Sequence, residues 1–275
     1  MNYYRPGGFS LLPTIIKNLL IINALFFLAT ISLKQAIGFD LDEYLALYYF
    51  DSTFFKPYQF ISYMFMHGGI SHIFFNMFAL WMFGKALEEV WGPKKFLIYY
   101  LVTGIGAAVV HTFVNWWTMS SMMTDFAAIK NTPSPELILR FVNDHLSNAN
   151  PKIYDFINQW SLTPNDTGYI NDAMSICTRI IDMKMNTPTV GASGAVYGVL
   201  LAFGMMFPNS LIYVFFAIPI KAKYFVIIYG AIELWTGISN DPTDNVAHFA
   251  HLGGMLFGFI LIKLWNKNEI NKFEI

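Results

Sequence analysis

The sequence predicts an all-α membrane protein, in which six transmembrane helices form a bundle and a long helical insert separates the third helix from the fourth. Hydrophobic residues make up 55% of the 275 residues and charged residues only 13%, whereas a soluble domain has about 25% charged residues. The mean hydropathy is +0.45. Several stretches without a charged residue are long enough to cross a bilayer, which takes about 20 mostly apolar residues. We therefore expect a single membrane domain covering residues 1–275.

Charge and cysteine content exclude several classes of protein. The chain has 17 Lys and Arg against 18 Asp and Glu, so it lacks the basic excess that is typical of nucleic-acid binders. Its one cysteine, Cys177, cannot form an internal disulfide, which excludes a disulfide-stabilised secreted scaffold. We expect Cys177 to have no chemical role.

Charge-free runs predict five of the six helices. These helices are expected at residues 14–34, 69–90, 95–115, 191–207 and 246–265. The first is predicted to be a membrane helix rather than a cleaved signal peptide, because no small-residue cleavage site follows it before Lys34. Residues 223–239 predict the remaining helix, the fifth in chain order, although Glu233 interrupts its apolar stretch.

The run that holds the fourth helix is longer than one crossing needs, and Pro208-Asn209-Ser210 divides it. Proline breaks a helix, so we expect the fourth helix to end before Pro208. Residues 211–220 are then expected to lie along the membrane interface, where Lys221 and Lys223 reach the lipid headgroups.

Residues 116–188 form the predicted insert. It carries seven acidic and five basic residues and is expected on the outer face of the membrane. Apolar residues at helical spacing follow Pro133–Pro135 and, again, Asn150-Pro151, which are signals for the start of a helix. The insert is therefore expected to be a small helical elaboration that lies on the membrane surface.

Basic residues near the helix ends predict the orientation. Ten of the 17 Lys and Arg residues fall on one side of a six-helix arrangement, and the positive-inside rule makes that side the cytoplasm. Both termini are then cytoplasmic. We expect an integral protein of a bacterial inner (plasma) membrane.

Polar side chains inside membrane helices are costly and indicate function. Ser193 lies in Gly191-Ala192-Ser193-Gly194-Ala195-Val196-Tyr197-Gly198, where small residues let a neighbouring helix come close. The motif alone is equally consistent with simple helix packing. A serine nucleophile also needs a base within hydrogen-bond reach.

The last helix offers two histidines for that role, His248 and His251. His251, Gly254 and Gly258 share one helix face, and Gly254-x-x-x-Gly258 is a close-packing motif. We therefore expect the fourth and sixth helices to touch, with His251 near Ser193. By spacing alone, either histidine could act as the base.

The second helix offers candidate donors for an oxyanion. His72 and Asn76 lie one turn apart on one face, and His67 precedes them in a Met66-His67-Gly68-Gly69 loop. Taken singly, each histidine is more often an interior side chain whose hydrogen bonds are satisfied. Polar residues near the outer ends of three different helices together favour a catalytic site.

With these motifs, the chain resembles the rhomboid intramembrane serine proteases. The matching motifs are His67-x4-His72-x3-Asn76, Gly191-x-Ser193-Gly194 with Tyr197, and Ala250-His251-x-x-Gly254-x-x-x-Gly258. The resemblance implies that Ser193 is the nucleophile and His251 the base, with no acid as a third member. It implies that His72, Asn76 and the Ser193 backbone N–H form the oxyanion hole, and that Tyr197 packs against the catalytic ring.

Gly84-x-x-x-Glu88 resembles the family's structural acid, although Glu88 and Glu89 could equally be solvated charges near Lys85. The chain also departs from the family. A Trp-Arg pair is frequent in the loop between the first two helices, and Lys56-Pro57-Tyr58-Gln59-Phe60 stands in its place. The insert is longer than the six-helix pattern requires.

The resemblance implies cleavage of transmembrane protein substrates near the outer membrane surface, with no cofactor. No metal site is expected, because the chain has no His-Glu-x-x-His motif, and the charge balance predicts no nucleic acid partner. Thr236–Asn245, rich in Gly, Asp, Pro and Asn, is expected to act as a lid. The alternatives are a non-catalytic rhomboid-like scaffold and a polytopic transporter. A transporter should show paired ionisable groups at mid-membrane, and Glu233 is the only residue that approximates this.

Overall fold

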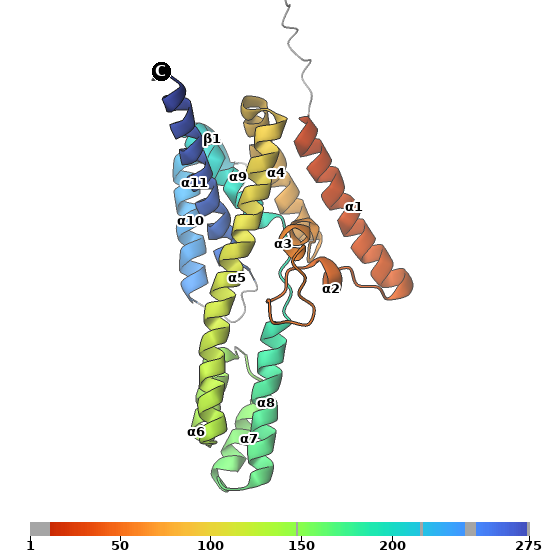
Figure 1. Cartoon of the computed structure of the whole chain (residues 1–275), viewed down its shortest axis with the longest axis vertical. Coiled ribbons are helices and arrows are strands. Elements are labelled where there is room, and N and C mark those ends of the chain that lie inside the picture. Colours follow the sequence, from red (N-terminus) through yellow and green to blue (C-terminus); the bar gives the residue numbers. More distant parts are fainter. Residues whose placement is uncertain (1–11, 147, 215–216, 240–245, 274–275) are drawn as a thin grey trace, which may run out of the picture.

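The protein is mostly helical, as predicted. The computed structural model describes residues 12–146, 148–214, 217–239 and 246–273 (Figure 1). The long helices of the bundle are α1 (Thr14–Ile37), α4 (Ile70–Trp91), α5 (Pro93–Asn131), α9 (Ser193–Met206), α10 (Ala222–Ser239) and α11 (His248–Phe273). The start of α1 and the end of α11 lie at one end of the bundle, and the insert extends from the other (Figure 1).

Among the described helices, four are long and apolar enough to cross a membrane: α1, α4, α5 and residues 248–266 of α11. The apolar helix α9 has only 14 residues, or about 21 Å, against about 30 Å of hydrocarbon. A short helix can be accommodated there because α4, α5, α10 and α11 all pack against it. These neighbouring helices surround α9 with protein rather than lipid.

Glycines set how closely the central helices approach. A Cβ on Gly254 of α11 would collide with the backbone carbonyl of Gly194 on α9, and a Cβ on Gly198 would lie 2.6 Å from Cβ of Thr103 on α5. Such contacts exclude any larger residue at these positions. The predicted glycine-mediated contact between the fourth and sixth helices is confirmed.

The structure corrects the predicted end of the third helix. We expected a helix at residues 95–115 with the insert starting at residue 116, but α5 continues without a break to Asn131. Its 39 residues extend about 58 Å, roughly twice the hydrocarbon thickness. The extension stays helical because Met119, Met122 and Ile129 are buried against the rest of the insert.

The insert has its own apolar core. Helices α6 (Pro135–His145), α7 (Pro151–Ser161) and α8 (Thr167–Met185) pack with the end of α5 around Phe141, Trp160 and Cys177. The two predicted start signals are confirmed: Ser134 and Asn150 accept hydrogen bonds from the first turns of α6 and α7. Burial raises the pKa of the Cys177 thiol to about 12, which keeps it protonated and unreactive.

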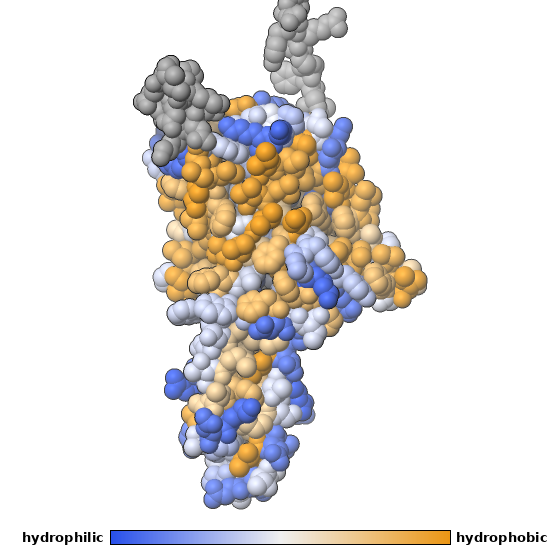
Figure 2. Space-filling view, in the orientation of Figure 1, coloured by the Kyte–Doolittle hydropathy of each residue, from blue (hydrophilic) through white to orange (hydrophobic). Residues whose placement is uncertain are grey.

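We expected the insert to lie on the membrane surface, and its arrangement relative to the bundle argues against this. It projects from the bundle along the long axis of the molecule (Figure 1). Figure 2 shows the hydrophobic surface gathered over the bundle and a mixed, more hydrophilic surface on the insert. The physical reason is that the apolar faces of α6, α7 and α8 are buried against one another and α5, so little apolar surface remains to bind lipid.

Residues 211–221 depart from the all-α prediction. Strands β1 (Leu211–Val214) and β2 (Ile218–Lys221) pair antiparallel, from Leu211 opposite Lys221 to Val214 opposite Ile218. This stretch was expected to lie along the membrane interface, and no strand was predicted in it. It is too short to span the membrane and rich in β-branched residues, so a hairpin satisfies its backbone hydrogen bonds.

The loop between α1 and α4 contains α2 (Asp42–Leu45), α3 (Gln59–Ser62) and the 3-10 turn η1 (Tyr63–Phe65). Gln59 is fully buried. Its side-chain oxygen accepts from the backbone N–H groups of Tyr48 and Lys56. Its amide nitrogen donates to the carbonyls of Tyr44 and Phe54, at 3.1 and 2.9 Å. This amide therefore holds together the loop in which the Lys56-Pro57-Tyr58-Gln59-Phe60 stretch lies.

Replacing Gln59 with Ala is expected to lower the free energy of unfolding by about 2–4 kcal/mol, because four hydrogen bonds are lost and buried backbone groups are left unpaired. Thermal unfolding in detergent micelles measures the change. Exposed Gln159 provides the control, since its replacement with Ala should leave the melting temperature unchanged. An unchanged melting temperature for Gln59→Ala would show that the loop is held by other contacts.

Candidate active site

Ser193 is the first residue of α9. The chain reaches it in extended form, pairing Thr189 with Leu47, and His111 of α5 is hydrogen bonded to the Thr189 hydroxyl at 2.8 Å. Gly191 then turns the backbone with a φ of +129°, which L side chains rarely adopt. At a helix N-terminus the first N–H groups have no partner within the helix. The Ser193 N–H is therefore available, beside its own hydroxyl, to an anionic oxygen.

His251, on the first turn of α11, faces Ser193 across the contact between α9 and α11. Its Nε2 lies 2.9 Å from Ser193 Oγ, which is hydrogen-bond distance. The Tyr197 ring stacks on the His251 ring, with a centroid separation of 4.1 Å and an angle of 5°. The side chain is buried, and the stacked ring restricts its rotation.

Glu233 also belongs to this group of side chains, although its sequence position did not predict it. Its Oε2 lies 2.9 Å from His251 Nδ1, on the side of the ring away from Ser193. The Tyr197 hydroxyl donates to the other carboxylate oxygen. The resemblance implied no acid as a third member of the site, and the structure places a carboxylate beside His251. Glu233 lies on α10, and only the packing of α10 against α9 and α11 brings it to the ring; the available signal was an acid inside an apolar helix.

His248, the other candidate base, lies one turn before His251. Its Nδ1 is 2.6 Å from Glu233 Oε2 and 3.0 Å from the Thr236 hydroxyl. The two histidines thus contact the same carboxylate oxygen. Of the two, His251 is the one whose Nε2 meets the serine hydroxyl at 2.9 Å, so the geometry favours His251 as the base.

Glu233, His248 and His251 together offer three possible metal-ligating atoms within 4.8 Å of one another. The atoms that would bind a metal are the ones that already form the hydrogen bonds to Glu233. A cation could enter only by replacing those bonds.

His72 faces the same site from the start of α4. The Gly68 N–H donates to His72 Nδ1 at 3.4 Å, so the neutral ring carries its proton on Nε2. A Cβ on Gly191 would lie 2.7 Å from that Nε2 and 3.4 Å from Ser193 Oγ. An N–H donor therefore points into the space beside the serine, and glycine at position 191 keeps that space open.

Asn76 and His67 have other surroundings. The buried Asn76 amide donates to the His72 carbonyl one turn earlier, at 3.0 Å, and its second N–H is not used by that bond. His67 stands edge-on to His72, with ring centroids 5.2 Å apart. Burial lowers the pKa of His67 to about 4, so this ring is neutral.

Glu88 lies at the opposite end of the bundle. It is 4% exposed, and its two carboxylate oxygens accept the Ile15 and Ile16 backbone N–H groups at 2.9 Å each. Glu88 therefore caps the start of α1 and is not a solvated charge, whereas Glu89 is exposed and 3.9 Å from Lys85.

The domain family described as Rhomboid matches residues 55–123 and 169–267, which are more than half of the chain. The chain belongs to the rhomboid family. Both matched segments contain parts of the site: His72 lies in the first, and Ser193, Glu233 and His251 lie in the second.

Three curated relatives are rhomboid proteins by name. An uncharacterized mitochondrial rhomboid protein of Schizosaccharomyces pombe is 27% identical over 213 residues, which are 75% of this chain and 51% of that protein. Mitochondrial RHOMBOID-like protein 12 of Arabidopsis thaliana is 23% identical over 69% of this chain and 41% of its own. The rhomboid protease GluP of Bacillus subtilis is 43% identical over a short match, 16% of this chain and 9% of that protein.

This rhomboid protein thus spans about half the length of the Schizosaccharomyces relative and less of the other two. It is a membrane protein. The two relatives with the longer matches are mitochondrial by name, so the relatives do not support the expected bacterial inner membrane.

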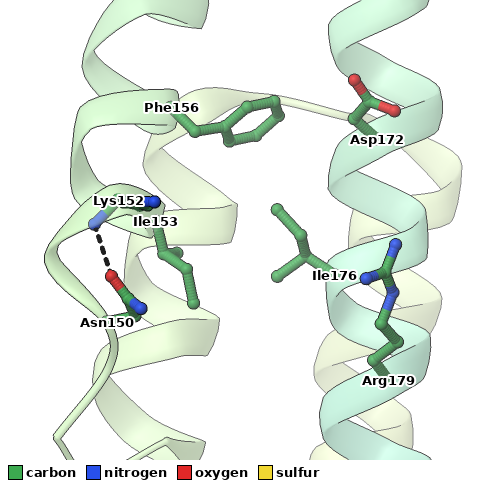
Figure 3. A pocket seen from close by; sticks show the side chains of 7 residues that line it. All are labelled: Asn150, Lys152, Ile153, Phe156, Asp172, Ile176 and Arg179. Carbon is green, nitrogen blue, oxygen red and sulfur yellow. Dashed lines mark hydrogen bonds between the residues drawn. The ribbon is translucent and has the colours of Figure 1, made fainter.

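The part of the insert between the matched segments includes α6 and α7. A hollow of about 350 Å³ lies between α7 and α8. Figure 3 shows Ile153 and Phe156 of α7 pointing toward Asp172, Ile176 and Arg179 of α8. None of the residues discussed above as members of the site lines this hollow. The predicted lid, Thr236–Asn245, lies largely outside the described residues, since α10 continues to Ser239 and residues 240–245 are not described.

Proposed function

We propose that this rhomboid protein is an intramembrane serine endopeptidase that cleaves transmembrane protein substrates near the outer membrane surface. Ser193 is the nucleophile and His251 the general base. The observation that supports this function most strongly is the 2.9 Å contact between His251 Nε2 and Ser193 Oγ, with glycines keeping the adjacent space open. A serine hydroxyl is a weak nucleophile until a base within hydrogen-bond reach takes its proton.

The proposed reaction proceeds in two halves. Ser193 Oγ attacks the scissile carbonyl carbon while its proton passes to His251 Nε2. The C–N bond then breaks, and His251 gives this proton to the leaving amine. A water molecule, deprotonated by His251, attacks the acyl-enzyme ester and releases the carboxylic acid and the free serine.

Oxyanion stabilisation is assigned to the donors around Gly191. The His72 Nε2–H, the Ser193 backbone N–H and the free N–H of the Asn76 amide would hold the oxygen that becomes negative in each tetrahedral intermediate. His72 already points its Nε2 into this space. Asn76 would reach the oxygen through the N–H that does not donate to the His72 carbonyl.

Substrate and water must both reach the outer end of the bundle. An intact transmembrane helix keeps its carbonyls hydrogen bonded, so the substrate is expected to unwind near Ser193 before it is attacked. The lipid bilayer holds both enzyme and substrate. No cofactor enters this scheme.

Labelling with a serine-directed fluorophosphonate tests this function against the alternatives of a non-catalytic scaffold and a transporter. Membranes containing the wild-type protein should be labelled, and membranes containing Ser193→Ala should not. Equal labelling of the two proteins would favour a non-catalytic protein. So would the absence of labelling in both, if a single-span substrate is also left uncleaved.

For the orientation, we propose that both termini face the cytoplasmic side or its organelle equivalent, and that the insert faces the opposite side. The start of α1 and the end of α11 lie at the same end of the bundle (Figure 1), which also holds Lys85, Lys94 and Lys95. A membrane-impermeant maleimide tests this orientation on variants that each carry a single cysteine, at Asn2, Ser147 or Lys272, in a Cys177→Ala background.

In intact cells, or in organelles with the outer side exposed, only Ser147→Cys should be labelled. Labelling of Asn2→Cys or Lys272→Cys would overturn the six-span orientation.

A further inference from the structure

Three side chains from two helices converge on Glu233 of α10. Tyr197 of α9 donates its hydroxyl to one carboxylate oxygen. His248 and His251 of α11 both direct Nδ1 at the other oxygen, at 2.6 and 2.9 Å. The Glu233 residue is only 6% exposed. Ionised carboxylates are rare inside membrane helices unless several donors satisfy them, and here three donors do so.

The contact between Glu233 and His251 has a chemical consequence. A carboxylate accepts hydrogen bonds, so the proton of the neutral His251 ring lies on Nδ1 and faces Glu233. The other nitrogen, Nε2, is then unprotonated and faces the Ser193 hydroxyl at 2.9 Å. This is the tautomer that a general base needs. When the ring takes a second proton from Ser193, the nearby carboxylate also stabilises the positive charge.

We infer that Glu233 is a positioning residue of the catalytic site, which fixes the tautomer of His251 and stabilises its protonated form. This inference rests on the proposed function and adds an acid to the Ser193–His251 pair. Tyr197 contributes to this positioning in two ways: its ring stacks on the His251 ring, and its hydroxyl donates a hydrogen bond to the Glu233 carboxylate. His248 supplies a second N–H to the same carboxylate oxygen, which offsets the cost of burying a charge.

The rival interpretation is that Glu233 only joins α10 to α9 and α11. Glu233→Gln separates the two roles, because the amide has the same shape and its oxygen can still accept from Tyr197. Its NH2 group would donate to His251 Nδ1 and so favour the proton on Nε2, the wrong tautomer for a base. Glu88→Gln is the matched control, since Glu88 is an equally buried acid that caps α1 far from Ser193.

The experiment uses the purified full chain in lipid bilayers with a single-span substrate. We expect Glu233→Gln to lower kcat about 10²-fold with little change in KM. This is less than the roughly 10⁴-fold loss for an acid-to-amide change in soluble serine proteases, because Tyr197 still holds the ring. Glu233→Asp keeps the charge and should retain more activity than Glu233→Gln. Glu88→Gln should lower the melting temperature and leave kcat per folded molecule unchanged.

A second measurement does not depend on activity. Nitrogen-15 NMR of the histidine-labelled protein, with His251 assigned by comparison with His251→Ala, reports which ring nitrogen carries the proton. We expect Nδ1–H in the wild-type protein and a shift toward Nε2–H in Glu233→Gln. An unchanged tautomer, or an unchanged kcat with a lowered melting temperature, would overturn the inference and leave Glu233 as a helix-packing residue.

The design also distinguishes other failures. If the wild-type protein shows no Ser193-dependent labelling or cleavage, the proposed function fails, and the NMR measurement still decides whether Glu233 sets the tautomer. If EDTA abolishes cleavage by the wild-type protein, added Zn²⁺ restores it and Glu233→Gln weakens the binding of Zn²⁺, then Glu233 is a metal ligand and the positioning role is overturned.

Discussion

Replacing Ser193 with Ala, or His251 with Ala, is expected to abolish cleavage of a single-span substrate while the protein still inserts and folds. The nucleophile and the base act as a unit, so the loss of either removes most of the rate; in a soluble serine protease this loss is about 10⁶-fold in kcat. Ser193→Ala deletes a single oxygen from a helix start, and the glycine contact between α9 and α11 is untouched. Turnover of purified protein in bilayers measures the loss.

The control for this prediction is the second histidine. His248→Ala removes one donor from Glu233 but leaves the 2.9 Å contact between His251 and Ser193 in place. It should therefore retain substantially more activity than His251→Ala. If His251→Ala cleaves at the wild-type rate, the assignment of His251 as the base is wrong and His248 becomes the candidate base. Melting temperatures of all variants distinguish loss of chemistry from loss of folding.

The next largest effect is expected at the oxyanion donors. His72→Ala removes an Nε2–H that faces the space beside Gly191 and Ser193, and Asn76→Ala removes an amide one turn further along α4. An oxyanion donor acts on charge that develops in the transition state, and losing one costs about 10²–10³ in rate in soluble serine proteases. Turnover should fall more than substrate binding weakens. The effect of Asn76→Ala should be the smaller, because its amide also bonds to its own helix.

Interhelical packing is the alternative role for His72 and Asn76. A side-chain hydrogen bond between membrane helices contributes only about 0.6 kcal/mol on average. A packing role therefore predicts a slightly lowered melting temperature with an unchanged rate per folded molecule, and an oxyanion role predicts the reverse. If both variants lose stability but cleave at the wild-type rate, these residues belong to the packing and the oxyanion is stabilised by other donors.

Much of the architecture could be predicted because it depends on local patterns. Apolar runs predicted the positions of α1, α4, α9 and α10 to within a few residues, together with the start of α11, since the requirement for apolar residues in lipid applies to every residue of a span. The proline break after α9 and the starts of α6 and α7 could likewise be predicted from the sequence, because caps and prolines act over one helical turn. The length of α5 was not, because its last turns are stabilised by burial against α6 and α8.

For the candidate site, the sequence by itself predicted that Ser193, His251 and His72 belong to one site, and that the helices of Ser193 and His251 meet through glycine faces. It could not determine which histidine meets the serine, because His248 and His251 share a helix face and differ by one turn. Only the tertiary structure decided that, through the contact of Gly254 with Gly194. It also brought Glu233 to His251, because a contact between residues on separate helices depends on how those helices pack, which no local spacing along the chain encodes.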